Sequence, residues 1–161
     1  MKMNTIVGDL WFDADEKGVT KVSFTLIEES ENANQDILNL AKEQFTEYFA
    51  EKREAFTVPL SIKTGTAFQQ DVWQALINIP YGETRSYKEV AQAIDNPKAV
   101  RAIGQANRVN PLPIIVPCHR VIGHNGQLTG YMGNGEEGLA KKRKLLLLEK
   151  NSFRIKMNRK S

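Results

Sequence analysis

The chain contains little cysteine and little histidine, and both shortages restrict the chemistry open to it. Its 161 residues include one cysteine, Cys118, and two histidines, His119 and His124. A single cysteine excludes an intrachain disulfide and suits a reducing compartment, so we expect the protein in the cytoplasm. A zinc site built from several cysteines is excluded for the same reason.

Long apolar runs are also absent. No stretch approaches the roughly 20 apolar residues that a membrane-spanning helix needs. The N-terminus reaches Asp9 without an apolar signal segment, so we expect neither membrane insertion nor secretion. Hydrophobic residues nevertheless make up 41% of the chain and charged residues 25%, which is enough for a folded core. The length fits one ordinary domain or two small ones.

Charge is unevenly distributed, although the formal net charge is only +3. Residues 1–64 contain 7 Lys and Arg against 12 Asp and Glu, whereas residues 65–161 contain 15 against 7. An acidic first part joined to a basic second part suggests that the second part meets a polyanion. Ordinary variation in surface charge stays open as the simpler interpretation.

The N-terminal part has the pattern of a small α/β domain. Residues 6–15 and 19–24 have strand character, and the second segment alternates apolar and polar side chains. Apolar residues then recur at helical spacing from Ile37 to Phe49. No chemical site is recognisable in this part. We place a linker at residues 61–65, which divides the chain into two domains, 1–64 and 65–161.

The second part is predominantly helical. Thr66 to Gln69 and Ser86 to Glu89 each fit a capping box, in which two side chains bind free amides at a helix start. Asn96 is expected to cap a further helix with Pro97 at its first position. That helix is predicted to bury Ala99, Val100, Ile103 and Ala106 and to expose Arg101, Gln105 and Arg108. Two short helices joined by a tight turn indicate a helix-turn-helix, although helical hairpins also occur in proteins that never contact DNA.

A leucine-rich helix is predicted near the end of the chain. It should run from about Gly138 to Glu149 and pack its leucines inward. The basic tail that follows, residues 154–161, is expected to fray.

The surroundings of Cys118 single it out as a candidate nucleophile. A lone cysteine is usually an inert buried residue. Here prolines restrict the backbone just before it and exclude a helix, and they stand at positions 111, 113 and 117. His119 and Arg120 follow directly, and either can favour the reactive thiolate. Through one water His119 can take the thiol proton, with a carboxylate such as Glu149 orienting the imidazole.

These residues resemble the active-site motif of the O6-alkylguanine-DNA alkyltransferases, of the methylated-DNA–protein-cysteine methyltransferase type. The motif reads Pro-Cys-His-Arg-Val-Ile-Gly and spans Pro117 to Gly123. The resemblance covers about residues 66–150 densely and residues 38–56 loosely. Its other pieces include Ile79-Pro80-Tyr81-Gly82-Glu83-Thr84, Arg101-Ala102-Ile103-Gly104 and Gly130-Tyr131. As a joint pattern it is specific to this family.

The resemblance implies both a fold and a reaction. The fold is α+β, with a small ribonuclease-H-like N-terminal domain followed by a helical winged-helix domain that binds DNA. The reaction is DNA repair by direct reversal, in which a methyl or other alkyl group moves irreversibly from O6-alkylguanine, and from O4-alkylthymine, to Cys118. It consumes the protein after one transfer and needs no cofactor and no metal. The partner is double-stranded DNA, bound through the minor groove by a monomer, with the damaged base flipped out.

The family's residue roles carry over to the matching positions. The catalytic set comprises an acceptor (Cys118), a water-linked base (His119), the carboxylate behind it (Glu149), a proton donor toward guanine N3 (Tyr87) and a hinge (Asn110). The DNA-binding set comprises Arg101, which fills the gap left by the flipped nucleotide, with Ala102, Gly104 and Arg108. The pocket walls are Val121, Tyr131 and Met132. Purely structural roles stay open for Tyr87 in the core, Arg101 on a solvated face, Glu149 at the surface and Asn110 in a turn.

The chain departs from the family pattern in the loop from Met132 to Gly138, which is longer than expected. Met132 also stands where many members have a small or hydroxyl residue, so the alkyl preference can differ. Two functions of other classes remain open. One is a helix-turn-helix protein that recognises alkylated DNA without reacting. The other is a cysteine hydrolase using Cys118 and His119, for which the sequence has no clear oxyanion-hole signature.

Overall fold

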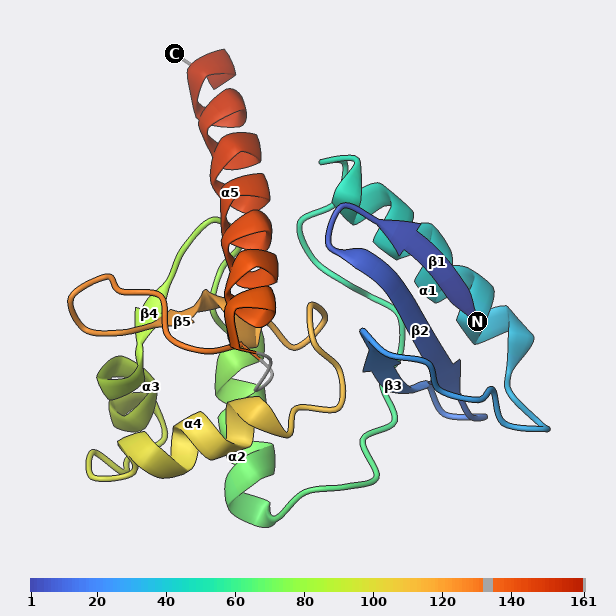
Figure 1. Ribbon diagram of the computed structural model, residues 1–161, viewed down its shortest axis with the longest axis horizontal. Helices are drawn as coiled ribbons and strands as arrows, with labels where there is room; N and C mark the ends of the chain where they lie inside the picture. Colours follow the sequence, from blue (N-terminus) through green and yellow to red (C-terminus); the bar gives the residue numbers. More distant parts are fainter. Residues whose placement is uncertain (132–134, 161) are drawn as a thin grey trace. The chain divides into compact units, whose positions relative to one another are not determined.

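The computed structural model describes the backbone of residues 1–131 and 135–160, with the side chains of these residues as far as position 151. Two compact units follow one another along the chain, residues 1–64 and residues 65–161 (Figure 1).

The first unit contains a three-stranded antiparallel sheet. β1 (Lys2–Thr5), β2 (Gly8–Ala14) and β3 (Val19–Ser23) pair in chain order. The sequence analysis did not predict β1, which is short and contains one apolar residue, Met3; this strand forms by backbone pairing along β2. The predicted strand also begins too early, since the Val7 amide donates to the Thr5 hydroxyl oxygen at 3.0 Å and Ile6 and Val7 form the turn before β2.

One helix, α1 (Gln35–Phe49), covers the sheet (Figure 1). Asn34 caps it by accepting a hydrogen bond from the Ile37 amide at 3.2 Å. Its apolar side packs on β2, where the rings of Phe12 and Phe45 have centroids 5.3 Å apart. The fully buried residues at this contact are Leu10, Phe12, Leu38, Ala41, Phe45 and Tyr48. Burial of large apolar side chains contributes about 1.5–3 kcal/mol each and holds the helix on the sheet.

Three helices form the base of the second unit: α2 (Ala67–Ile77), α3 (Tyr87–Ala93) and α4 (Val100–Arg108). Both predicted capping boxes are confirmed, at the starts of α2 and α3. α2 and α3 both pack against α4. The buried Trp73 indole also donates a hydrogen bond to the Ala106 carbonyl at 2.9 Å, which ties α2 to α4. The helix-turn-helix pair is therefore held by a core of its own.

The prediction for the start of α4 was wrong. The helix begins at Val100, three residues after Pro97, and no side chain among the described residues caps it. The Ala99 amide donates to the Asn96 carbonyl at 3.0 Å, so these residues form a turn that has Pro97 at its second position. Proline favours that position because its φ is already suitable. Val100 was expected to be buried and is 40% exposed, whereas the predicted burial is confirmed for Ile103 and Ala106.

A short parallel ribbon joins the helix-turn-helix to the cysteine segment. The ribbon pairs β4 (Arg85–Ser86) with β5 (Val121–Ile122). Cys118 lies just before β5 in a single 3-10 turn, η1 (Cys118–Arg120). The prolines thus exclude an α-helix here but permit this tighter turn. The ribbon places the start of α3 next to the residues that follow the cysteine.

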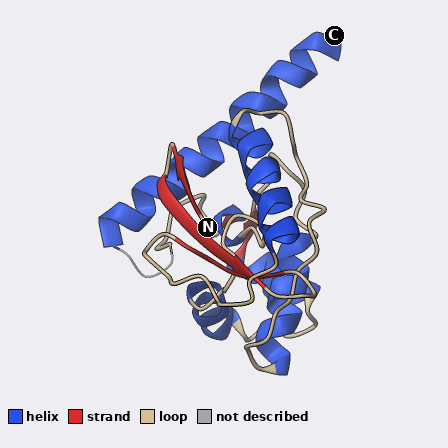
Figure 2. Ribbon diagram, turned by 90° about the vertical axis from the view of Figure 1, so that its right-hand side faces the viewer, coloured by secondary structure: helices blue, strands red, loops and turns tan. Residues whose placement is uncertain are grey.

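The final helix, α5 (Gly135–Lys160), is longer than the predicted one, and Figure 2 shows it as one unbroken helix. Residues 154–160 of the basic tail, for which fraying was expected, are part of this helix. The leucine run also does not form the buried face as a whole, since Leu147 is 50% exposed. Helical spacing turns successive leucines to different sides, and the buried face consists instead of Gly138, Lys142, Leu145 and Glu149. None of the described helices is both long and apolar enough to cross a membrane.

Candidate active site

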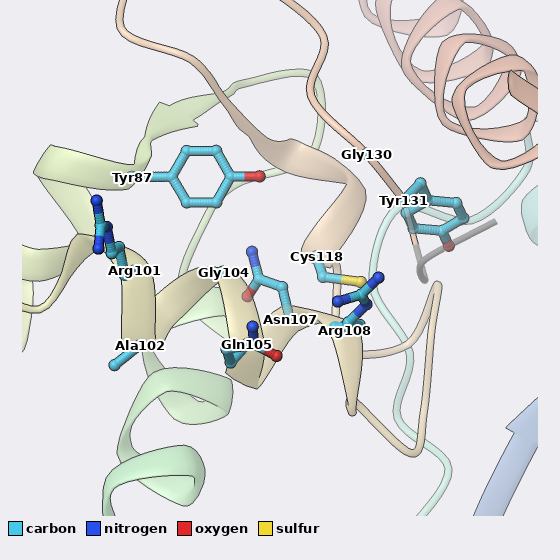
Figure 3. Close-up of a pocket in the computed structure, with 10 residues that line it drawn as sticks. All are labelled: Tyr87, Arg101, Ala102, Gly104, Gln105, Asn107, Arg108, Cys118, Gly130 and Tyr131. Atoms are coloured by element: carbon cyan, nitrogen blue, oxygen red, sulfur yellow. The ribbon is translucent and has the colours of Figure 1, made fainter. Parts of the chain in front are cut away.

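A pocket of about 470 Å³ lies in the second unit, with Cys118 in its wall (Figure 3). Many of the sequence-predicted site residues meet here: Tyr87, Arg101, Ala102, Gly104, Arg108, Cys118 and Tyr131. In Figure 3 the phenol of Tyr87 reaches in from one side, and Cys118 lies on the other. The pocket therefore combines a hydroxyl donor, a thiol and a wall formed by α4.

Asn110 positions the thiol. Its side-chain amide donates to the Val116 carbonyl at 2.9 Å and to the Cys118 Sγ at 3.3 Å. Its side-chain oxygen accepts a hydrogen bond from the Leu112 amide at 2.9 Å. The buried Asn110 side chain thus binds two other residues of the loop between α4 and η1 as well as the thiol. A residue that only formed a turn would not need these contacts.

The resting thiol is protonated. Cys118 is 3% exposed, and this burial raises the pKa of its thiol to about 11. The hydrogen bond from Asn110 and the positive charge of Lys142 offset the burial only in part. Because the thiolate is the nucleophile, the site needs a base to generate it.

His119 is bound so that it can be that base. Its Nε2 lies 2.7 Å from the Glu149 Oε2, and both side chains are buried. A carboxylate only accepts hydrogen bonds, so the proton of the neutral imidazole resides on Nε2. The other nitrogen, Nδ1, then carries a lone pair; it is buried and has no hydrogen-bond partner within the described part of the chain. This is the arrangement of a general base oriented by a carboxylate.

Arg120 holds Glu149 in place. Its guanidinium donates to both carboxylate oxygens, through Nε at 2.8 Å and through Nη2 at 3.0 Å. A third bond, from Nη1 to the Ile79 carbonyl at 2.7 Å, fixes the guanidinium itself. Burial disfavours the charge of Glu149, but the interactions with His119 and Arg120 outweigh it and hold the pKa of Glu149 well below its usual range. The sequence analysis considered Arg120 as a positive charge that favours the thiolate. In the structure its guanidinium binds the Glu149 carboxylate instead.

The sequence analysis missed Lys142. This residue is 1% exposed, and its ammonium donates to the Thr129 carbonyl at 3.4 Å. Burial lowers the pKa of Lys142 to about 8, and ionisation of the nearby Cys118 thiol would favour the charged form of the lysine. In the sequence, Lys142 stands among other basic residues (Lys141, Arg143 and Lys144). Its one distinguishing feature is that it precedes Glu149 by seven residues, a spacing that places both on the same face of a helix.

The three predicted pocket walls have different locations. Tyr131 lines the pocket, and burial raises the pKa of its phenol well above the usual value. Val121 is buried in β5 opposite Arg85 and is not among the residues that line this pocket. Met132 lies outside the described residues. The sequence analysis did not identify Asn107, which lines the pocket with a buried side-chain oxygen that has no partner among the described residues.

Part of the pocket wall formed by α4 is exposed to solvent. Arg101, Ala102 and Arg108 are exposed, and a Cβ added at Gly104 would meet nothing within 4 Å. The fold of this unit therefore gives no steric reason for a glycine at position 104. Among the described residues, no group of three or more His, Cys, Asp or Glu side chains is placed to hold a metal ion.

Comparisons with known proteins agree with this geometry. Two family descriptions match the chain: "6-O-methylguanine DNA methyltransferase, DNA binding domain" over residues 67–151, and "6-O-methylguanine DNA methyltransferase, ribonuclease-like domain" over residues 2–62. The constitutive methylated-DNA–protein-cysteine methyltransferase of Bacillus subtilis is 47% identical over 94% of this chain and 95% of its own length. The Methanosarcina acetivorans methylated-DNA–protein-cysteine methyltransferase is 46% identical over 89% and 92%.

Solved structures show the same relationship. The crystal structure of Mycobacterium tuberculosis OGT in complex with DNA is 42% identical and superposes with a TM-score of 0.81, covering 94% of this chain and 92% of that one. The α+β expectation, a ribonuclease-like domain followed by a helical DNA-binding domain, is thereby confirmed. With both parts matched and relatives aligned over nearly its whole length, the chain belongs to the O6-methylguanine DNA methyltransferase family.

Proposed function

We propose that the protein repairs O6-methylguanine in DNA by moving the methyl group to Cys118. The observation that carries this proposal is the buried thiol in the pocket wall, behind which His119 is oriented by Glu149. The relatives from Bacillus subtilis and Methanosarcina acetivorans are methylated-DNA–protein-cysteine methyltransferases, and the related Mycobacterium tuberculosis protein forms a complex with DNA.

The geometry of the site supports a reaction in which proton transfer from the thiol precedes attack on the alkyl carbon. The Nδ1 of His119 takes the Cys118 proton, directly or through a water, and the imidazolium that forms is stabilised by Glu149. The thiolate attacks the alkyl carbon, so a sulfur–carbon bond forms while the bond from that carbon to O6 breaks. The electron pair stays with the purine, and Tyr87 donates its hydroxyl proton to N3 to give neutral guanine. The phenolate then recovers a proton from the imidazolium or from solvent.

The product is a thioether, which explains why the protein is consumed. The chain has no second cysteine that could take the alkyl group from Cys118. O4-alkylthymine presents the same alkyl–oxygen linkage next to a ring nitrogen, and we include it as a substrate. Because the protein needs no partner copy for these steps, we propose that it acts as a monomer.

The exposed face of α4 is our proposed DNA contact. Arg101 inserts into the base stack at the gap that the flipped nucleotide leaves, and Gly104 lets the helix backbone approach the minor groove. Ala102 and Arg108 lie on the same wall of the pocket. A base flipped past this wall would enter the pocket that Cys118 and Tyr131 line. We assign DNA recognition and chemistry to residues 65–161.

An intact-mass measurement tests the proposal. After incubation with duplex DNA containing O6-methylguanine, the protein should gain one methyl group on Cys118 and then stop. Cys118→Ser should bind the same duplex and gain nothing. DNA binding by the wild type without any mass increase would support a damage-recognition module instead, and turnover beyond one equivalent would support a hydrolase.

A further inference from the structure

A hydrogen bond joins Tyr87 to Thr129, a residue to which no role has so far been given. The two hydroxyl oxygens lie 2.5 Å apart, and 42 positions separate the residues in the chain. Tyr87 is the first residue of α3, and Thr129 stands directly before Gly130 and Tyr131, which line the pocket. The bond therefore links the proposed proton donor to the opposite rim of the pocket.

The fold brings Thr129 to this place by backbone contacts. β4 ends at Ser86, next to Tyr87, and pairs there with Ile122 at the end of β5. The chain then folds back on itself, since the Gly123 amide donates to the Gln127 carbonyl at 2.8 Å. Thr129 follows this turn.

The backbone of Thr129 is held from a second side. Its carbonyl accepts the hydrogen bond from the buried Lys142 on α5, at 3.4 Å. Thr129 is thus bound both through its side chain and through its main chain. A residue held in this way presents its hydroxyl in a defined position.

The chemistry decides which oxygen donates. A phenol has one proton, and a Tyr87 hydroxyl that donated to Thr129 would have no proton to offer the purine. With a base in the pocket, the threonine must therefore be the donor and the phenol oxygen the acceptor. As the Tyr87 proton moves to N3, negative charge develops on the phenol oxygen, and the bond from Thr129 becomes a stronger, charge-assisted one.

We propose that Thr129 is a positioning residue of the transfer reaction, whose hydroxyl donates to the Tyr87 oxygen and so directs the phenol proton toward the departing guanine. This inference rests on the proposed function, in which Tyr87 protonates N3. Thr129 acts through Tyr87 and need not touch the substrate.

Two substitutions separate the hydroxyl from the shape of the side chain. Thr129→Val keeps the branched shape and removes the hydroxyl, and Thr129→Ser keeps the hydroxyl. Single-turnover transfer from an O6-alkylguanine duplex should slow on the order of ten-fold in Thr129→Val, because a hydrogen bond to a charged group is lost. Thr129→Ser should restore most of the rate. Thr46→Val is the matched control, since the Thr46 hydroxyl donates to the Lys42 carbonyl within α1, far along the chain from the pocket residues, and it should leave the rate unchanged.

A double-mutant cycle distinguishes a role through Tyr87 from support of the loop. In a Tyr87→Phe background the phenol oxygen is gone, so Thr129→Val should cause little further loss. Free O6-alkylguanines that carry an electron-withdrawing substituent on the purine ring give a second readout. They release a less basic purine that needs less protonation, so both Thr129→Val and Tyr87→Phe should recover toward the wild-type rate.

Two other results of these rate measurements would contradict the role of Thr129. A Thr129→Val rate that is not below the wild-type rate would mean that the bond does not assist the transfer, and an equal loss in the Tyr87→Phe background would mean that Thr129 only supports the loop. Either result overturns the inference while wild-type transfer still stands. Absence of transfer in the wild type would instead overturn the proposed function.

Discussion

Cys118 and Lys142 are buried close enough for each to influence the other's charge, and their pKa values shift in opposite directions. Burial raises the pKa of Cys118 from about 9 to about 11, so the folded protein binds more protons than the unfolded chain between these pH values. Burial lowers the pKa of Lys142 from 10.5 to about 8, so the folded protein binds fewer protons over that range. With rising pH, the thiol therefore lowers the free energy of unfolding and the lysine raises it.

Removing either group should reveal how the other one changes the free energy of unfolding with pH. Lys142→Met leaves the thiol, and its free energy of unfolding should fall relative to that of the wild type between about pH 8 and pH 10, on the order of 1 kcal/mol. Cys118→Ala leaves the lysine, and its free energy of unfolding should rise over the same interval. Urea unfolding at the two pH values measures both. Identical pH dependence in the three proteins would show that these groups titrate normally.

At the scale of single elements, α4 lines the pocket and, in our proposal, also contacts DNA. Arg101 is exposed at the pocket edge and, in our proposal, stabilises only the state in which the nucleotide has left the stack. Unstacking a base costs on the order of a few kcal/mol, so loss of this support should slow reaction with a duplex strongly. Arg101→Ala should therefore react slowly with alkylated duplex and nearly normally with the free O6-alkylguanine base.

Paired single-turnover rates test this prediction. Tyr87→Phe is the contrasting variant, because loss of the proton donor should slow the duplex and the free base alike. Equal losses on both substrates for Arg101→Ala would place this residue in the chemistry or in the fold.

Gly104 tests whether the backbone of α4 approaches DNA. A methyl group at this position would meet nothing in the free protein, and alanine favours a helix over glycine by about 1 kcal/mol. Gly104→Ala should therefore unfold at the same or a higher temperature and yet bind duplex DNA more weakly. Its reaction with the free base should be unchanged. Undiminished DNA affinity would show that the glycine is not needed for DNA contact.

At the scale of the whole molecule, the basic charge is concentrated in residues 65–161, which contain 15 Lys and Arg against 7 Asp and Glu. Phosphate contacts release counterions, so DNA affinity should fall linearly with salt on logarithmic axes. Arg108→Ala should reduce this slope by about one if Arg108 contacts one phosphate. Lys42→Ala, in the acidic first unit, is the control and should leave the slope unchanged. A salt-independent affinity would contradict the proposed DNA interface.

The sequence by itself determined the features that depend on neighbouring positions. The capping boxes at Thr66 and Ser86 were predictable because each joins residues only three apart. The candidate nucleophile and its base were predictable because Cys118 and His119 are adjacent within a distinctive motif. The charge difference between the two parts likewise follows from composition alone.

Only the tertiary structure decided the contacts between distant segments. The start of α4 was mispredicted because a local turn at Asn96 and a helix cap there have the same sequence signal. Lys142 has the same side chain as Lys141, and only the packing of α5 determines that Lys142 is the buried one. The bond between Tyr87 and Thr129 requires the β4–β5 pairing and the turn after it. No local pattern encodes such a contact, because it forms only when segments that are distant in the sequence pack together.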